Sequence, residues 1–266
     1  MPVSCWPWKQ IRSTTVRFPR LLAGLGLAAL TGIAGTACTT HAGAAAQVGS
    51  SAIETSTLRD IVERGVEAVE ASAGEQAVLN VNRPMLQRNA LTTLVRIELL
   101  ESEADRLGVS VSDQEVDAYY QAYAVLQAGS VEEFEQQAAG GGYDKEYLST
   151  VVYMFALQSA IVDKVAPDKL ASEDEAREYY DTIVDQFGEI PLSFEQSRPY
   201  LQRLIPAEDR AAVLLPLLEE AAQREGISIN PRFGQWNMEE LAVVSADGTI
   251  ATTPEPAPGI DLPREF

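Results

Sequence analysis

Histidine is nearly absent from this sequence of 266 residues. The single histidine, His41, lies in a run of small and polar residues from 39 to 49. Without imidazole elsewhere, the chain cannot form a His-dependent catalytic triad or a His-based metal site. A Gly-rich phosphate loop is also missing, because the glycines at 140–142 are not followed by Lys-Ser/Thr. We therefore expect no catalytic residues, no metal and no cofactor, and predict that the chain is not an enzyme.

Basic residues are scarce as well. The chain has 20 Lys and Arg against 39 Asp and Glu, for a net charge of -19. Four of these bases, Lys9, Arg12, Arg17 and Arg20, fall within the first 37 residues, which hold no acidic residue. The rest of the chain is thus still more acidic, and its surface repels phosphate backbones and anionic headgroups. We expect no nucleic-acid partner.

Long apolar runs are limited to residues 21–34, LLAGLGLAALTGIA. As a helix these 14 residues would span roughly 21 Å, short of the ~30 Å hydrocarbon core. In a secretory signal peptide a basic segment comes first, followed by a short apolar segment and then by small residues, and residues 1–37 follow this order. The pattern favours a cleaved signal over a retained anchor.

Cysteine occurs only at Cys5 and Cys38. The sequence GTAC at 35–38 resembles a bacterial lipobox, although Gly35 stands where Leu is usual. Cys5 would leave with the signal, so Cys38 would be an exported thiol with no partner in the chain. This favours lipidation of Cys38 with palmitate-type chains, which anchor the protein to the extracytoplasmic face of the cell membrane. Ordinary cleavage, after Ala37 or within 41–46, remains the alternative and gives a secreted protein.

Helix signals fill the rest of the chain. Capping boxes begin at Ser112, Ser130 and Ser172. The expected helices start at Thr57 and then cover 84–107, 113–127, 131–139, a segment from Asp144 to before Pro167, 173–187, 194–205 and 207–225. We predict an all-α fold with one or two short strands, near 48–53 and 227–229. The expected organisation is a signal peptide at 1–37, a tether at 38–50, a helical domain at 51–236 with helices 194–225 packing back on it, and a disordered Pro-rich tail at 237–266.

Tyrosines are the main candidates for a binding surface. Tyr119, Tyr120 and Tyr123 share one predicted helix, and adjacent residues cannot both face one core. Tyr combines a wide apolar face with a polar tip, which suits peptide contacts of low specificity. Packing between helices is the alternative for each of them.

Several stretches, in order, resemble the SurA/PrsA-like family of extracytoplasmic chaperones. They are AAQVGSSAIETSTLRDIV at 45–62, RNALTTLVRIELLESEADRLGVSVSDQEVDAYY at 88–120 and SEDEAREYYDTIVDQFG at 172–188. GISINPRFGQW at 226–236 is similar to the C-terminal segment of actinobacterial lipoproteins that carry a SurA N-terminal domain. In the foldases of this family a parvulin-type prolyl isomerase domain follows the third stretch. Here residues 187–194 lead directly to the next helix.

The resemblance implies a lipid-anchored chaperone module that binds unfolded or nascent exported polypeptides without ATP. It would contact the membrane only through the anchor and need no metal. Two alternatives stay open: an envelope assembly or adaptor lipoprotein with one fixed partner, and an isomerase-family protein with residual foldase activity.

Overall fold

A computed structural model describes residues 43–246 of the chain. Over these residues the backbone forms nine helices and five short strands, which confirms the predicted mainly helical fold with a few short strands. The helices are α1 (Thr55–Ala73), α2 (Glu75–Val78), α3 (Arg83–Leu107), α4 (Asp113–Ala128), α5 (Val131–Gly140), α6 (Lys145–Val165), α7 (Glu173–Phe187), α8 (Phe194–Leu204) and α9 (Ala207–Glu225). The strands are β1 (Ala44–Val48), β2 (Ser51–Glu54), β3 (Ile227–Ile229), β4 (Gln235–Asn237) and β5 (Ala242–Val244). Cys38, the predicted signal peptide and the last part of the predicted tail lie outside the described residues.

Local signals in the sequence set several helix starts. Full capping boxes are present at Ser112 with Glu115, at Ser172 with Glu175 and at Ser193 with Gln196. Ser130 forms only half of the expected box: its hydroxyl accepts from the Glu133 backbone N–H, but Glu133 does not return the bond. Each cap satisfies backbone donors that the first helical turn leaves without a partner.

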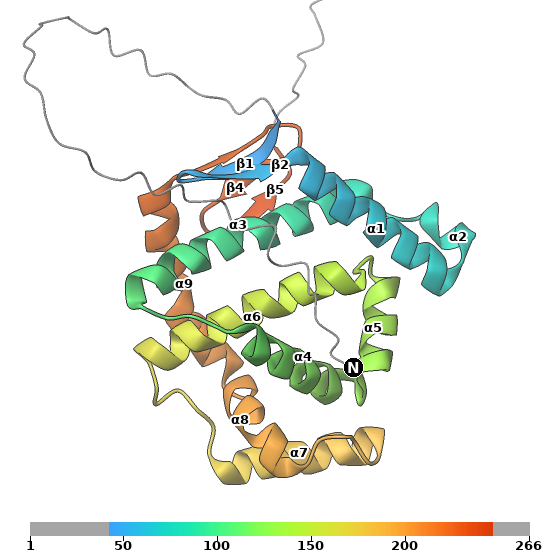
Figure 1. Ribbon diagram of the computed structural model, residues 1–266, viewed down its shortest axis with the longest axis vertical. Coiled ribbons are helices and arrows are strands. Elements are labelled where there is room, and N and C mark those ends of the chain that lie inside the picture. The colour runs from blue at the N-terminus through green and yellow to red at the C-terminus, as the bar shows by residue number, and fades with distance from the viewer. Residues whose placement is uncertain (1–42, 247–266) are drawn as a thin grey trace, which may run out of the picture. The chain divides into compact units, whose positions relative to one another are not determined.

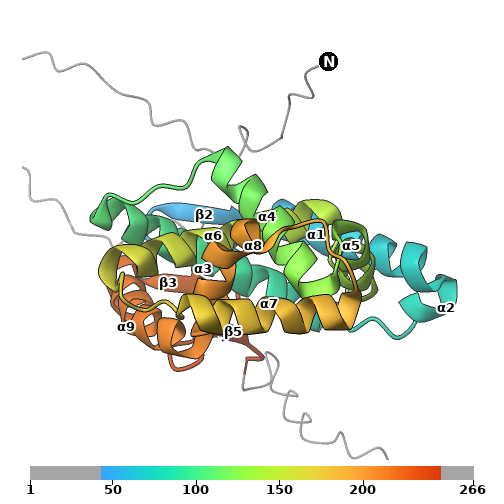
Figure 2. The same cartoon turned by 90° about the horizontal axis from the view of Figure 1, so that it is seen from below.

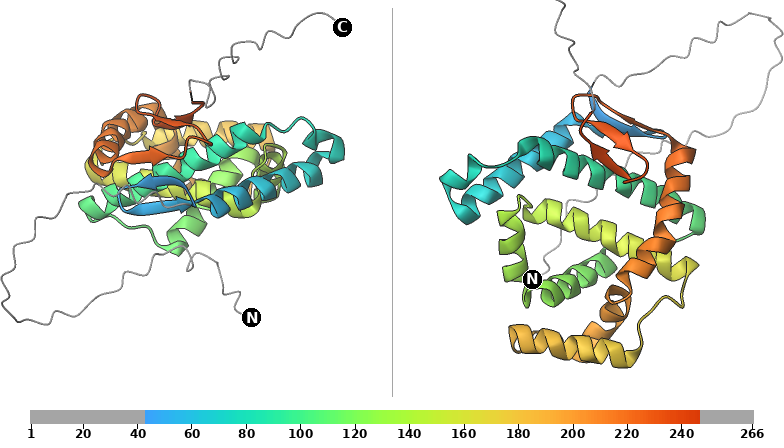
Figure 3. Two further views of the ribbon diagram at one scale, coloured as in Figure 1. Left: turned by 90° about the horizontal axis from the view of Figure 1, so that it is seen from above. Right: turned by 180° about the vertical axis from the view of Figure 1, so that it is seen from behind.

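The largest core lies around α3. Strands β2, β1 and β3 form an antiparallel sheet in that order, and α3 lies between this sheet and α6 (Figure 1). Leu91, Val95, Leu99 and Leu100 of α3 are completely buried. Helix α9 runs along the ends of α3 and α6 and links β3 to the region of α8 (Figure 3). The apolar residues of α3 cover more than one narrow stripe, as in a helix enclosed by others, and α3 packs against α1, α6, α9, β1 and β5.

A second apolar cluster joins α4, α7 and α8. It is built from Val125, Leu126, Ile183, Phe194 and Leu201, all buried. Figure 2 shows α7 beside α8, in agreement with the close packing of this pair. A third cluster, of α4, α5 and α6, completes the packing around α4. Helix α4 therefore contributes to both the second and the third cluster, and its contact with α8 lies outside the core around α3.

Two boundaries of the expected organisation differ from the structure. Residues 44–48, expected in the tether, form β1, whose Ala45, Ala46 and Val48 are buried. Small side chains suggest a linker by composition, but they also fit a strand that packs closely on α3. In the expected tail, residues 242–244 form β5, with Leu241 and Val243 buried. Arg96 Nε donates to the Leu241 carbonyl at 2.8 Å, and the Val243 N–H donates to Thr92 Oγ1 at 2.8 Å, so this segment is fixed to α3.

Helix α6 is the one helix in residues 43–246 that is long and apolar enough to cross a membrane, with a mean hydropathy of 1.3. It packs against α3, α4 and α9, and Val152, Leu157 and Ile161 are buried. This is the pattern of the central helix of a folded core, since such helices are apolar on most sides.

Candidate functional site

A hollow lined by aromatic and aliphatic side chains lies between α4 and α8. Tyr119, Tyr123 and Leu126 come from α4, and Tyr200 and Leu204 come from α8. Its volume is about 250 Å³, counting the space at its open mouth. We call this the Tyr119 hollow. Most of that space is open to solvent, and the enclosed part would hold only roughly one or two water molecules, so the hollow is a shallow depression.

The rings of the Tyr119 hollow hold one another in place. The rings of Tyr119 and Tyr200 meet edge to face with centroids 5.8 Å apart, and those of Tyr119 and Tyr123 are nearly parallel at 6.2 Å. Behind them, Tyr123 packs on Phe134 and Phe155 at 5.6 and 5.4 Å. Aromatic pairs in these geometries contribute about 0.5–1.5 kcal/mol beyond area burial, so the walls are stiff.

The predicted trio of tyrosines is divided by the structure. Tyr119 and Tyr123 lie one helical turn apart and line the hollow. Tyr120 is buried on another side of α4 with Leu148 and Val152, and its hydroxyl donates to Glu135 Oε1 at 2.9 Å. Successive helical residues point about 100° apart, which explains the division. Tyr120 thus lies in the core, away from the proposed contact surface.

Tyr200 and Leu204 were missed from the sequence. They lie four residues apart on α8, so the helical period places them on one face. That period was readable, but their position opposite Tyr119 depends on how α8 returns to α4. No local pattern specifies such a contact.

Burial keeps the tyrosines of the hollow neutral. It raises the pKa of Tyr119 to about 12, with Tyr123 adding to the rise and Arg210 and Arg203 opposing it. Burial also raises the pKa of Tyr123 and of Tyr200. Below pH 10 each phenol therefore keeps its proton, because burial disfavours the charged form. The hollow can offer apolar ring faces together with neutral hydroxyls, and it has no fixed charge of its own.

A buried arginine joins the helices behind the hollow. Arg210 of α9 is only 6% exposed, and its guanidinium donates to the carbonyl oxygens of Lys169 and Ser159 and to Asp163 Oδ1 at 2.8–3.0 Å. Arg203 of α8 binds the other oxygen of Asp163 at 2.8 Å. One carboxylate of α6 thereby fixes both α8 and α9, and so the position of Tyr200 and Leu204.

Two other predictions about sites, the absence of a metal and the lipidation of Cys38, are not tested by the structure. Residues 43–246 hold no group of three or more His, Cys, Asp or Glu side chains able to bind a metal ion, and the expectation of a metal-free protein stays an expectation. Cys38, the predicted lipidation site, lies outside this range.

The fold and the hollow together define a mainly helical protein with a shallow aromatic depression between α4 and α8. Residues 10–140 match the model of a family described as the SurA-like N-terminal domain. Foldase protein PrsA from two strains of Clostridium perfringens is 24% identical over 102 residues, which cover 38% of this chain and 30% of the relative. No solved structure matches. These matches support the resemblance to SurA/PrsA-like chaperones that was drawn from the motifs of the chain.

The same comparison corrects one prediction. We expected the chain not to be an enzyme, because its one histidine, His41, lies outside the predicted helical domain and residues 187–194 leave no room for a parvulin domain. The relatives are named as foldases, and the exclusion is therefore wrong. It was drawn from missing residue types, which describe one known catalytic domain and not every way to accelerate folding. The chain spans only 30% of the length of each of these relatives.

Proposed function

We propose that the chain is a chaperone-like protein that binds unfolded or nascent exported polypeptides without ATP. The observation that carries the proposal is the Tyr119 hollow, an aromatic site within a SurA/PrsA-like chain. Tyrosine faces bind apolar side chains of many shapes, and phenol hydroxyls exchange hydrogen bonds with any peptide backbone. Such a site suits weak binding of varied clients.

The excess of acidic residues in the chain indicates which polypeptide segments it would bind. Over the whole chain acidic residues outnumber basic ones by 39 to 20, and the hollow itself holds no charged side chain. An acidic surface attracts basic segments and repels acidic ones and anionic lipid. The proposed clients are therefore apolar segments that are uncharged or flanked by basic residues.

Aggregation of a denatured secreted protein tests this function. We expect the purified chain to suppress aggregation at near-stoichiometric amounts and Tyr200→Ala to require roughly five to ten times more protein, since a lost aromatic contact is worth about 1 kcal/mol. Tyr179→Ala is the matched control, because Tyr179 is 44% exposed on α7 and lies outside the hollow. Thermal unfolding of both variants separates lost binding from lost folding. No suppression at tenfold excess of the folded chain would contradict the proposal.

We also propose that Cys38 carries the lipid anchor and that the protein acts at the extracytoplasmic face of the membrane. Support comes from the signal-like order of residues 1–37 and from the resemblance to exported chaperones. Two acyl chains at ~0.8 kcal/mol per buried CH₂ are enough for stable attachment. The anchor would be the only contact with the membrane.

The intact mass of the membrane-extracted protein measures the anchor. We expect a diacylglyceryl adduct on a chain that starts at residue 38, and loss of the adduct and of membrane attachment in Cys38→Ala. A soluble product that starts near Gln47 would instead show a secreted protein. It would leave the proposal on polypeptide binding unaffected.

A further inference from the structure

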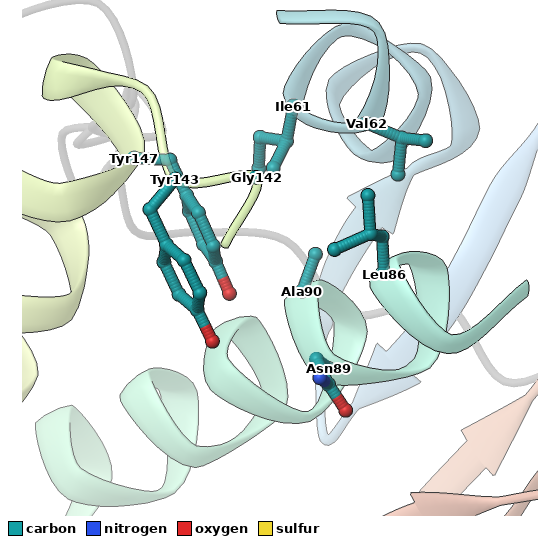
Figure 4. A pocket seen from close by; sticks show the side chains of 8 residues that line it. All are labelled: Ile61, Val62, Leu86, Asn89, Ala90, Gly142, Tyr143 and Tyr147. Atoms are coloured by element: carbon teal, nitrogen blue, oxygen red, sulfur yellow. The ribbon is translucent and has the colours of Figure 1, made fainter. Parts of the chain in front are cut away.

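One face of α3 is covered by β5 along only part of its length. Thr92 and Arg96 of this face bind the backbone of β5, each through a hydrogen bond of 2.8 Å. Met85 and Asn89 precede them at helical spacings, which place all four residues on one side of the helix. Both are exposed, Met85 by 46%. Figure 4 shows Asn89 near the start of α3, with its amide turned away from Leu86. Within residues 43–246, β5 thus leaves the first turns of this face uncovered.

Strand β5 runs toward the uncovered part of this face. Its backbone bonds first to Arg96 and, two residues later, to Thr92, so the strand and the helix point in opposite directions. From Thr92 to Met85 is about 10.5 Å along the helix axis. The residues from Val243 to Ala246, the last described residue, reach about 10 Å when extended. The chain therefore leaves the described range close to Met85 and directed toward the start of α3.

The next residues of the chain match this face in charge and polarity. In a chain of 39 acidic and 20 basic residues, Arg88 of α3 lies beside the face and forms no ion pair within residues 43–246. The segment 247–250 has the sequence DGTI, with Asp247 first and Ile250 as its one large apolar residue. Along the direction of β5, Arg88 comes before Met85, just as Asp247 comes before Ile250. An acid thus approaches an unpaired base, and an apolar side chain approaches an exposed apolar one.

We infer that the segment 247–250 continues along α3 beyond β5 and docks on the uncovered face of the helix. Its Asp247 carboxylate pairs with the Arg88 guanidinium. Its Ile250 side chain packs on Met85, whose flexible and polarizable side chain adapts to the shape of its neighbour. The site is thus an intramolecular one, and its ligand is a segment of the same chain. The inference does not depend on the proposed function.

Asn89 lies between these two contacts and suits an extended backbone. Its amide forms no hydrogen bond to any of residues 43–246, and it has a donor and an acceptor side by side. A peptide group offers the complementary pair. A tethered segment is also present at an effective concentration of about millimolar, so a few weak contacts are enough to hold it. The docked segment closes this face of α3 to other polypeptides.

Methionine methyl signals test the contact in the full-length protein, labelled with ¹³C at its four methionines. Met85→Leu assigns the signal of Met85, and the buried Met154 serves as an internal control. Ile250→Ser is expected to move the Met85 signal to its position in a chain that ends at Ala246. It should also increase the relaxation of this signal by a soluble nitroxide at least twofold. Ile260→Ser, the matched control ten residues further along the chain, should leave the signal unchanged.

Charge substitutions test the ion pair. The position of the Met85 signal between its docked and undocked values gives the ratio of docked to undocked chains. Asp247→Asn should lower this ratio roughly 1.5- to fivefold, the effect of one exposed ion pair, and Arg88→Gln should have the same effect with no further loss in the double variant. Glu255→Gln in the same part of the chain and Arg83→Gln on another side of α3 are the controls. A loss no larger for Asp247→Asn than for Glu255→Gln would overturn the pairing.

Three results would overturn the docking itself. The first is a Met85 signal that is the same in the intact chain, in Ile250→Ser and in the chain that ends at Ala246. The second is an equal response to Ile250→Ser and to Ile260→Ser. The third is a signal that moves with protein concentration, which would indicate that a second copy of the chain covers this face. Because the substituted residues lie outside the core, circular dichroism should show the same helical content in every variant.

Discussion

Arg210→Met is expected to destabilise the fold by about 3 kcal/mol, the size of effect seen when a buried charged network loses one member. Met keeps much of the volume of the arginine stem, so the loss comes from hydrogen bonds and not from a cavity. Four acceptors lose this donor: the carbonyl oxygens of Lys169 and Ser159, Ser159 Oγ and Asp163 Oδ1. For a domain of this size the midpoint of thermal unfolding should fall by roughly 6–12 °C. Circular dichroism at 222 nm follows the transition.

Arg198→Met is the matched control for this experiment. Arg198 also pairs with carboxylates, those of Glu173 and Glu195, but it is 38% exposed and both partners are more so. Exposed ion pairs contribute little, because water already solvates both charges. The control should change stability by under about 0.5 kcal/mol. Equal effects of the two substitutions would show that Arg210 is no more than another surface charge.

The consequences of Arg210→Met should extend to binding. Asp163 would still bind Arg203, but α9 would lose the hydrogen bonds of Arg210 to α6 and to the loop at Lys169. Tyr200 lies three residues before Arg203 on α8 and forms one wall of the Tyr119 hollow. Below the new unfolding temperature, suppression of aggregation should therefore weaken while the helical content stays unchanged.

Helices were well predicted because their signals are local. The capping boxes at Ser112 and Ser172 begin α4 and α7 at the expected residues. The long apolar pattern that ends at Gly108 gives α3, whose last turn is closed by that glycine in a left-handed conformation. In each of these cases a few adjacent residues satisfy the backbone groups of one helix end, so the pattern can be read without the fold.

Strands and sites were less predictable because they join distant parts of the chain. Strand β1 pairs with β3, about 180 residues later, and its small residues show no alternation that would mark it as a strand. Tyr119 and Tyr200 meet only through the return of α8 to α4. Adjacent tyrosines at 119 and 120 did indicate that one of them lies near the surface. The partner of the exposed one depended on tertiary packing.

The second large effect is expected at Gly65, where α1 crosses the turn before α6. A Cβ at this position would be 2.4 Å from the carbonyl oxygen of Gly142, which belongs to the backbone and cannot rotate away. Gly142 itself is in a left-handed conformation, and a Cβ added to it would lie 3.1 Å from Leu86 Cδ2, so the turn has little room to move. Gly65→Ala must therefore displace α1. We expect a loss of about 3 kcal/mol, at the upper end of overpacking, although Ala favours an isolated helix over Gly.

Gly140→Ala separates overpacking from helix propensity. Gly140 is the last residue of α5, and a Cβ there would meet only Ser72 Oγ, at 3.9 Å. This substitution should be neutral or stabilise by up to about 1 kcal/mol, because Ala is the better helix former. Urea denaturation of both variants gives the comparison. Displacement of α1 would also separate Ile61 and Val62 from Leu86 and Tyr143. Unchanged stability of Gly65→Ala would mean that α1 and the turn before α6 are not in close contact in solution.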